Sequence, residues 1–262
     1  MPDAAELEAA YASWYRPASG RFAAGGDALL RRSRATLARR VDRRAPPGPV
    51  LDVGCGDGAL LDALRGRGRD ALGLERDPRR SDVRACEVTE LEDRVGEWAA
   101  VVFWHSLEHL AAPAAALDQT RELLCAGGLL VLAVPNRASR QARRFGERWF
   151  ALDLPRHLVH FSAAALIEGL QQRGLEIERV SYWRGGQVVF GWLDGLVGTL
   201  PGHPDLYAAI RQPLARGEAI GPARRGAALL AGAMLAPAAL ACAAAEVRAG
   251  AGGTVYIEAR KQ

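Results

Sequence analysis

The chain has 262 residues, of which 49% are hydrophobic and 24% charged, enough to build one large domain with a buried core. Its formal net charge is only +4, which is too weak a signal to indicate a nucleic-acid partner. Its four cysteines are scattered without a C-x-x-C pair, which favours a reducing compartment over a disulfide-bonded secreted protein. The acidic first residues lack the pattern of a signal peptide, so the sequence predicts a cytoplasmic protein.

The N-terminal 44 residues predict helices. Aromatic side chains in residues 1–26 are typical of a helix that packs its rings on a larger domain; they are Tyr11, Trp14, Tyr15 and Phe22. Residues 27–44 predict a second helix, with Asp27 as its cap and an apolar face opposite a run of arginines. Such a charged run usually faces solvent, and an anionic substrate or membrane surface is the alternative. The proline-rich residues 46–49 end this helix.

Residues 50–58, V-L-D-V-G-C-G-D-G, predict a strand, a tight turn and the start of a helix. Glycines at positions 54, 56 and 58 suit a backbone that turns sharply beside a ligand, where a Cβ has no room. A turn without a ligand is the alternative. Glu75, however, closes the next apolar run, where an acid at a strand tip can bind both hydroxyls of a ribose.

Strands and helices alternate from residue 49 to residue 134. The expected strands are 49–53, 70–74, 83–87, 100–104 and 128–134, and the expected helices between them are 58–66 and 114–125. Later elements are a helix over 163–173 and strands over 175–183 and 254–259. This alternation predicts a parallel sheet covered by helices, with ligands beyond the carboxyl ends of its strands.

The stretch Leu51–Gly58 and the tripeptide Gly73-Leu74-Glu75 resemble motifs I and II of class I S-adenosylmethionine (SAM) methyltransferases. A nicotinamide-binding fold is the rival, but its G-x-G-x-x-G spacing differs from the G-x-G-x-G found here. The resemblance implies a Rossmann-like α/β fold with a seven-stranded, mostly parallel sheet. Its last strand, 254–259, is then antiparallel and lies between the fifth and sixth strands. SAM is the implied cofactor, and S-adenosyl-L-homocysteine the product.

The same resemblance implies the residues that contact SAM. They are Asp52, Gly54, Cys55, Gly56, Glu75, Glu87, Trp104 and His105. Glu87 ends the third expected strand, where the family more often has Asp bound to the adenine amino group. The segment 103–110 resembles the family's post-strand-4 segment, which starts near the methionine part of SAM; its Glu108 and His109 are expected in structural roles. Related enzymes also close an N-terminal segment on SAM, so Tyr11 and Trp14 are candidate substrate contacts in a cap.

Residues 149–162, W-F-x-L-D-x-P-R-H-L-x-H-F-S, resemble a segment of the ubiquinone-biosynthesis-like methyltransferases of types 11 and 23. His157 is the first candidate for a general base and His160 the second, although an ordinary hydrogen-bonded role is the alternative for each. Arg156 and Asn136 are candidate substrate contacts. No metal site is assigned, because the segment around Glu108 carries fewer acids than the metal-using relatives.

The expected domains are an N-terminal cap over 1–44 and a SAM-binding domain over 45–262, with an apolar helical insertion at 184–253. Residues 226–245 contain no charge and could just span a bilayer. A span would, however, separate the last two strands of the sheet, and the segment is mostly Ala and Gly with Pro237 inside. A buried helix or helical hairpin is therefore expected. A peripheral contact of residues 187–245 with the inner face of the membrane is the alternative.

Together these features predict a SAM-dependent methyltransferase that acts on a small-molecule acceptor, at oxygen, with a hydrophobic or lipid-linked acceptor as the finer hypothesis. A SAM-binding regulatory or scaffold protein without catalysis is the second hypothesis. Methylation of nucleic acid is the third; no N/D-P-P-Y/F motif follows the fourth expected strand, so no nucleic-acid partner is expected. The sequence predicts no oligomeric state.

Overall fold

The computed structural model describes residues 2–12, 22, 25–183, 186–211 and 220–262, so Trp14 lies outside the described residues. The chain groups into two compact units. The first comprises Met1–Ala28, Pro135–His160 and Tyr182–Thr254, and is called the insertion unit; the second comprises Leu29–Val134, Phe161–Ser181 and Val255–Gln262, and is called the sheet unit. The boundary expected after residue 44 does not divide these units, because most of the helix that ends there belongs to the sheet unit.

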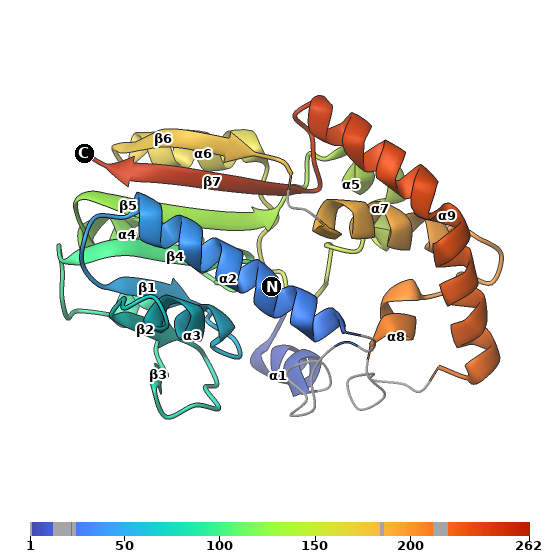
Figure 1. The fold of residues 1–262 in the computed structure, drawn as a ribbon, viewed down its shortest axis with the longest axis horizontal. Helices are drawn as coiled ribbons and strands as arrows, with labels where there is room; N and C mark the ends of the chain where they lie inside the picture. Colours follow the sequence, from blue (N-terminus) through green and yellow to red (C-terminus); the bar gives the residue numbers. More distant parts are fainter. Residues whose placement is uncertain (1, 13–21, 23–24, 184–185, 212–219) are drawn as a thin grey trace. The chain divides into compact units, whose positions relative to one another are not determined.

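The sheet unit is built on a seven-stranded sheet with the strand order β3-β2-β1-β4-β5-β7-β6 (Figure 1). The strands are β1 (Val50–Val53), β2 (Ala71–Leu74), β3 (Val83–Arg84), β4 (Trp98–Trp104), β5 (Leu124–Pro135), β6 (Leu175–Ser181) and β7 (Thr254–Lys261). Strands β1 to β5 pair in parallel, and β7 runs antiparallel to β6. The predicted Rossmann-like sheet, with its last strand between the fifth and the sixth, is thereby confirmed.

The central strands are buried because helices cover the sheet. All seven residues of β4 and all four of β1 are buried, which agrees with their almost continuous apolar sequences. Val53 is in register with Leu74 on one side and with Phe103 on the other. Strands β1, β2 and β4 therefore end at the same edge of the sheet, and the residues that follow them share that edge.

Helices in the sheet unit are α2 (Gly26–Arg44), α3 (Ala59–Arg65), α4 (Pro113–Leu123) and α6 (Ala163–Gln172), with short 3-10 turns η1 (Val88–Glu90) and η2 (Leu107–His109). The apolar face of α2 joins the sheet core through Leu37 and Val41. Its arginine run is partly paired: Arg40 Nη2 lies 2.8 Å from Glu258 Oε2, and Arg44 Nη2 lies 2.7 Å from Glu178 Oε2. Part of the charged face is thus used to hold α2 on the sheet.

The third expected strand is shorter than predicted. Strand β3 has only two residues, and Glu87 is instead the N-cap residue of η1, with its backbone N–H donating to Glu90 Oε2 at 2.8 Å. An edge strand with one neighbour gains little from extension, and the acidic residues at 87 and 90 form a capping box that favours a turn.

The insertion unit is helical. Its helices are α1 (Ala4–Ala12), α5 (Arg140–Phe145), α7 (Gly186–Gly198), α8 (Leu206–Ile210) and α9 (Pro222–Arg248), with the short turn η3 (Gly146–Arg148). Phe145, Trp149 and Trp192 pack with the small side chains of Ala239 and Ala243 on α9. In Figure 1, α7 and α8 lie along α9.

This apolar segment was expected to form a buried helix or a helical hairpin; the helix is confirmed, but the expectation that it is buried is wrong. Helix α9 runs without a break from Pro222 to Arg248, through Pro237, and only 22% of its most apolar 18-residue stretch is buried. Alanine propagates a helix better than any other residue, so the Ala-rich sequence favours one long helix over a turn. Its composition predicts a helix but does not predict how much of the helix is covered.

A buried polar network fixes the C-terminal end of α9. Glu246 is completely buried, and its carboxylate accepts hydrogen bonds from the Gln141 backbone N–H (2.8 Å), Gln141 Nε2 (3.0 Å) and Trp192 Nε1 (2.8 Å). Trp149 Nε1 donates to Gln141 Oε1 at 3.3 Å. These bonds join α9 to α5 and α7, and a buried carboxylate without them would be strongly destabilising.

Candidate cofactor site

The glycine-rich turn after β1 has the left-handed backbone that the sequence predicted. Gly54, Gly56 and Gly58 have φ angles of 74°, 63° and 76°. A Cβ on Gly54 would lie 2.5 Å from the Cβ of Ser106, the second residue after β4, so this position needs glycine for space as well as for conformation. The Ser106 hydroxyl donates to the Val53 carbonyl and holds the two strand ends together.

Glu75 lies beside this turn at the end of β2. Its Oε2 accepts a hydrogen bond from the Gly56 backbone N–H at 2.9 Å, and its Oε1 accepts one from the Arg76 N–H at 3.0 Å. The side chain is 8% exposed. Each carboxylate oxygen can accept more than one hydrogen bond, so these two bonds do not by themselves prevent the carboxylate from binding a ribose.

Asp52 is buried at the end of β1, with 2% of its surface exposed. Burial is the main cause that raises the pKa of its carboxyl to about 7; Arg34 opposes the shift, and the nearby charges of Glu75 and Asp57 add to it. The carboxyl is thus poised to lose its proton near neutral pH. A cationic group beside it would favour the ionised form.

The end of β4 carries an aromatic wall. Trp104 is 8% exposed, and the guanidinium carbon of Arg34 on α2 lies 5.1 Å from the centre of its ring. His105 follows with a φ of 55°, unusual for a residue with a side chain, and its Nδ1 lies 3.3 Å from Oε1 of the buried Glu108. Cys55 is buried too, and its Sγ would lie 2.6 Å from a Cβ on Gly73.

These residues fit SAM. The alternate glycines give the turn its left-handed backbone, the two carboxylate oxygens of Glu75 beside it would hold the hydroxyls of a ribose, and the buried carboxyl of Asp52 would hold the ammonium group of the methionine part. Six of the eight predicted contacts lie where β1, β2 and β4 end: Asp52, Gly54, Cys55, Gly56, Glu75 and Trp104. His105 directly follows β4, whereas Glu87 is exposed at the start of η1.

The other predicted site residues belong to the insertion unit. Asn136 is buried; its Nδ2 donates to the Gly252 carbonyl at 3.0 Å, and its Oδ1 accepts from the Ala138 N–H at 3.2 Å. Arg156 forms an ion pair with Asp153. Tyr11 is a partly exposed residue of α1. The roles assigned to these side chains stay predictions.

The two candidate bases each bond a backbone carbonyl. His157 Nδ1 lies 2.9 Å from the Ala151 oxygen, and His160 Nε2 lies 2.9 Å from the Leu152 oxygen. A carbonyl only accepts, so these nitrogens carry the hydrogen, and the neutral rings adopt opposite tautomers. The acceptor nitrogen is then Nε2 in His157 and Nδ1 in His160.

Comparison with protein families identifies the chain. A family model described as a methyltransferase domain matches residues 26–180, more than half of the sequence. The chain belongs to the class I, SAM-dependent methyltransferase family. The match covers the glycine turn, Glu75 and the candidate histidines, and it ends where β6 does.

Curated relatives of this methyltransferase include ubiquinone biosynthesis O-methyltransferases. The protein from Psychrobacter arcticus is 32% identical over 105 residues, 34% of this chain and 41% of its own length. The protein from Xanthomonas axonopodis pv. citri is 30% identical over 153 residues, 50% of this chain and 64% of its own length. The alignments thus span between two fifths and two thirds of these relatives.

Solved structures share the fold at low sequence identity. A SAM-dependent methyltransferase from Archaeoglobus fulgidus superposes with a TM-score of 0.54 and 15% identity, covering 87% of this chain and 94% of that one. The [4+2]-cyclase SpnF superposes with a TM-score of 0.52 and 21% identity, covering 87% and 80%. Because one of these proteins is named as a cyclase, the shared fold alone does not specify methyl transfer.

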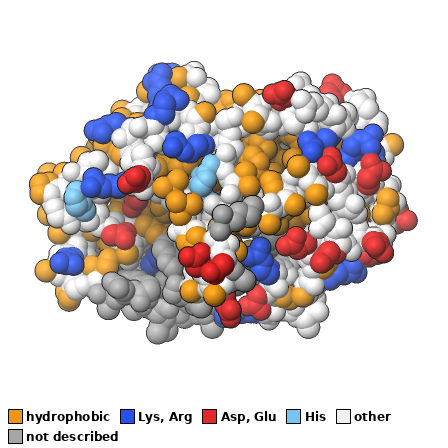
Figure 2. All heavy atoms as spheres, turned by 180° about the vertical axis from the view of Figure 1, so that it is seen from behind, with side chains coloured by type: hydrophobic (Ala, Val, Ile, Leu, Met, Phe, Trp, Pro, Cys, Tyr) orange, Lys and Arg blue, Asp and Glu red, His pale blue; other side chains and the backbone are white. Residues whose placement is uncertain are grey.

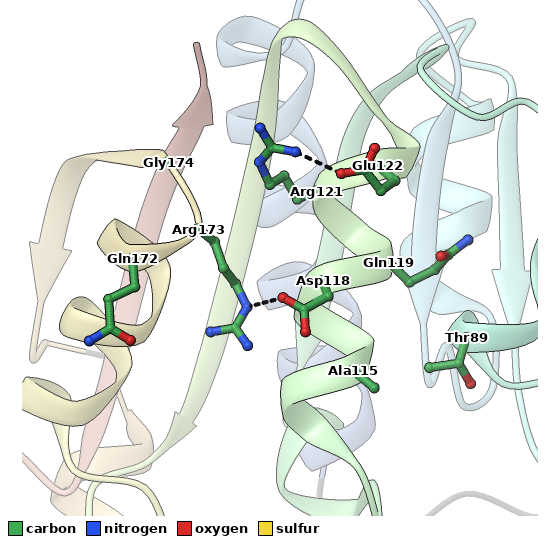
Figure 3. Close-up of a pocket in the computed structure, with 9 residues that line it drawn as sticks. All are labelled: Thr89, Ala115, Asp118, Gln119, Arg121, Glu122, Gln172, Arg173 and Gly174. Carbon is green, nitrogen blue, oxygen red and sulfur yellow. Dashed lines mark hydrogen bonds and ion pairs between the residues drawn. The ribbon is translucent and has the colours of Figure 1, made fainter.

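A separate groove in the methyltransferase's sheet unit lies between α4 and the end of α6 (Figure 3). It has a volume of about 690 Å³, and ion pairs of Arg173 with Asp118 and of Arg121 with Glu122 line it. Arg121 and Glu122 lie in the last turn of α4, just before β5 begins, so they lie at the sheet edge opposite the glycine turn. None of the predicted cofactor residues lines this groove.

Sequence reasoning missed two supporting residues. Ser106 lies against Gly54, and Arg34 covers Trp104, although each pair is separated by at least 50 positions in the chain. The arginine run on α2 predicted only a charged face, because no local pattern distinguishes Arg34 from its neighbours.

Proposed function

We propose that this methyltransferase transfers a methyl group from SAM to an oxygen of a small-molecule acceptor. The observation that carries the proposal is the hydrogen bond from the Gly56 backbone to Glu75, which fixes an acid beside a left-handed glycine turn at the end of β1. Family membership supports methyl transfer, and the names of the curated O-methyltransferases support oxygen as the methylated atom.

In this proposal Glu75 binds the ribose hydroxyls, and Asp52 attracts the positively charged end of the methionine part. Glu87 contacts the adenine, while Trp104 and His105 line the methionine end of the site. Cys55 contributes from the glycine turn after β1. When bound, SAM supplies an electrophilic methyl group on a positively charged sulfur. The protein's task is to orient the acceptor in line with that methyl and to exclude water.

Methyl transfer to a hydroxyl releases one proton, which a general base must accept. The acceptor's oxygen–carbon bond forms as the sulfur–carbon bond breaks, the electron pair of the broken bond stays on sulfur, and the hydroxyl proton passes to a histidine. His157 is the first candidate for that role and His160 the second, with Arg156 and Asn136 as substrate contacts. Tyr11 and Trp14 complete the site as a cap.

A hydrophobic or lipid-linked acceptor is the finer part of the proposal, together with a cytoplasmic location at the inner face of the membrane. Support comes from the apolar segment that ends in α9, whose large side chains are exposed. Such a surface suits an enzyme that takes an acceptor with poor solubility in water.

Two other functions remain as alternatives. A protein that binds SAM without transferring a methyl group would also keep the glycine turn and Glu75. The structure of SpnF, which is named as a [4+2]-cyclase, illustrates that proteins named for another activity share this fold. Methylation of nucleic acid finds little support in the charge distribution. On the face in Figure 2, Lys and Arg side chains (blue) lie among Asp and Glu (red) and hydrophobic ones (orange).

Two measurements test the proposal. Calorimetry with SAM, S-adenosyl-L-homocysteine and NAD should show binding of the first two only. Transfer of label from [methyl-³H]SAM should then occur to at least one member of a panel of small hydroxylated aromatic compounds, and not to amines of similar size. Binding of SAM without transfer to any acceptor would favour the non-catalytic alternative, and binding of NAD instead would contradict the proposal.

A further inference from the structure

Four large apolar side chains of α9 are exposed. Leu230 is 64% exposed, Met234 73% and Leu240 54%, and Leu229 is 40% exposed. Leu230, Met234 and Pro237 follow one another at intervals of four and three, so they form one stripe along the helix. A helix in a water-soluble protein normally has the reverse arrangement, with large apolar residues inside.

The inward face of α9 is made mostly of small residues, with Leu235 half-buried and Glu246 buried beside them. Ala228, Ala239 and Ala243 are at most 1% exposed, and a Cβ on Gly232 would lie 3.0 Å from Leu206 Cδ1 of α8. Small residues at intervals of four let helices approach closely, a pattern common where the opposite face meets lipid. Helix α9 therefore packs on its own unit through its small side and leaves its apolar side uncovered within the described residues.

Charged residues lie only at the two ends of this surface. No charged residue occurs between Arg225 and Glu246, and the exposed arginines Arg224 and Arg248 flank that interval. Trp183, half-exposed, follows Tyr182, which packs against Gly252 just beyond the end of α9. Arginine and tryptophan beside an apolar surface are the side chains that anchor proteins in the headgroup region.

A bilayer surface explains this pattern better than a second copy of the chain does. A helix of 27 residues is about 40 Å long and about 10 Å wide, so its outward face covers roughly 400 Å². A stable protein interface needs about 800 Å² on each partner. Crossing the bilayer is disfavoured as well, because it would pull Glu246 away from its three hydrogen bonds and leave a carboxylate in lipid.

We propose that the outward face of α9 lies flat in the headgroup region of a bilayer that contains anionic lipids. The apolar stripe enters the acyl boundary, and Arg224 and Arg248 bind lipid phosphates at the two ends. This inference deepens the proposed function and rests on it in one respect: a hydrophobic acceptor would reach the enzyme from the same bilayer.

Vesicle co-sedimentation of the full-length protein tests the proposal. Vesicles of phosphatidylcholine alone are compared with vesicles of phosphatidylcholine and phosphatidylglycerol, and we expect the protein to sediment with the mixed vesicles. The variant L230E/M234E should bind at least about a hundredfold more weakly, since each buried apolar side chain contributes tenfold or more. The variant R224Q/R248Q should lose about fivefold per arginine on mixed vesicles only.

The matched control is L29E/V95E, which adds the same two charges at exposed apolar positions of the sheet unit (67% and 52% exposed) and should bind like the wild type. If L230E/M234E fails to fold by circular dichroism, L230Q/M234Q replaces it. Wild-type protein that stays in the supernatant with both vesicles would overturn the proposal, as would equal binding by L230E/M234E and the control. A dimer in sedimentation velocity that L230E/M234E dissociates would overturn it in favour of a second copy.

Calorimetry with SAM on the same preparations separates the two claims. Vesicle binding without SAM binding would contradict the proposed function and leave the membrane surface standing. SAM binding without vesicle binding would contradict the membrane surface and leave the proposed function standing.

Discussion

The backbone N–H of Gly56 donates a hydrogen bond to Oε2 of Glu75, with 2.9 Å between the two atoms. The bond joins the turn after β1 to the tip of β2, so the carboxylate that we propose for binding the ribose also shapes the glycine turn. Because Glu75 is 8% exposed, a change at this position removes a buried acceptor from the Gly56 N–H as well as the proposed contact to SAM.

Glu75→Ala should therefore weaken SAM binding by about 3 kcal/mol, roughly a hundredfold, as expected for lost hydrogen bonds to a charged group. Calorimetry with SAM measures the loss, and the thermal midpoint without ligand shows how much of it comes from the turn itself. Glu92→Ala, at an exposed position, is the control and should bind SAM like the wild type. Unchanged affinity in Glu75→Ala would remove Glu75 from the proposed site.

The raised pKa of the Asp52 carboxyl predicts that the stability of the fold depends on pH. Its folded-state pKa of about 7 lies above the ordinary value of 3.8, because burial disfavours the charge. The folded form thus keeps a proton that the unfolded chain loses. The contribution of this protonated carboxyl to the free energy of unfolding is therefore complete below about pH 4 and is lost as pH rises to about 7. Its size is about 4 kcal/mol, from about 1.4 kcal/mol per pKa unit.

The free energy of unfolding, measured by urea titration without ligand, should accordingly fall between about pH 4 and about pH 7 in the wild type, and less so in Asp52→Asn. SAM affinity should change in the opposite direction over the same interval, since the ionised carboxylate attracts the ammonium group. A wild type and an Asp52→Asn variant with parallel pH profiles would contradict this assignment.

Much of the cofactor site could be predicted because its signals are local. The strand before Gly54, the glycine turn and Glu75 fall within 26 consecutive residues, and each has a distinct pattern. The contacts of Ser106 with Gly54 and of Arg34 with Trp104 were not predictable, because tertiary packing brings distant positions together.

In the insertion unit, prediction from the sequence was limited for a different reason. The sequence of α9 predicts a helix, but its nearly uniform Ala and Gly content gives no strong apolar face, so the side that packs on the protein could not be read from periodicity. Close approach of α8 at Gly232 selects the small side as the inner one. Glu87 illustrates the effect of a short edge strand, where a capping turn replaced the expected strand end.

Gly54→Ala tests the packing at the glycine turn. The left-handed φ of 74° and the 2.5 Å approach to the Ser106 Cβ should together destabilise the fold by about 2–4 kcal/mol. The double variant Gly54→Ala/Ser106→Gly removes the clash but not the backbone strain, so it should recover part of the loss relative to Ser106→Gly alone. Urea titrations of the three variants and the wild type give the comparison. If the losses in free energy of unfolding of the two single variants add up to that of the double variant, the two residues do not interact.

Glu246 should be essential for docking of α9. Glu246→Ala leaves the buried N–H groups of Gln141 and Trp192 without their acceptor, at a cost of about 2–4 kcal/mol in the free energy of unfolding. Glu246→Gln keeps one oxygen in place and should lose about half as much. Urea titration measures the stability of both variants. Equal stability of Glu246→Ala and the wild type would mean that the network does not hold the helix.

The opposite tautomers of His157 and His160 give the last prediction. Nitrogen-15 correlation spectra of the neutral rings should show the hydrogen on Nδ1 in His157 and on Nε2 in His160, because each bonds a backbone carbonyl. His157→Asn can keep a donor toward the Ala151 oxygen while removing the basic nitrogen. If His157 is the base, this variant should fold and bind SAM normally but transfer methyl groups about 10²–10⁴ times more slowly. Normal transfer by His157→Asn with slow transfer by His160→Gln would assign the proton to His160, and normal transfer by both would remove the pair from the chemistry.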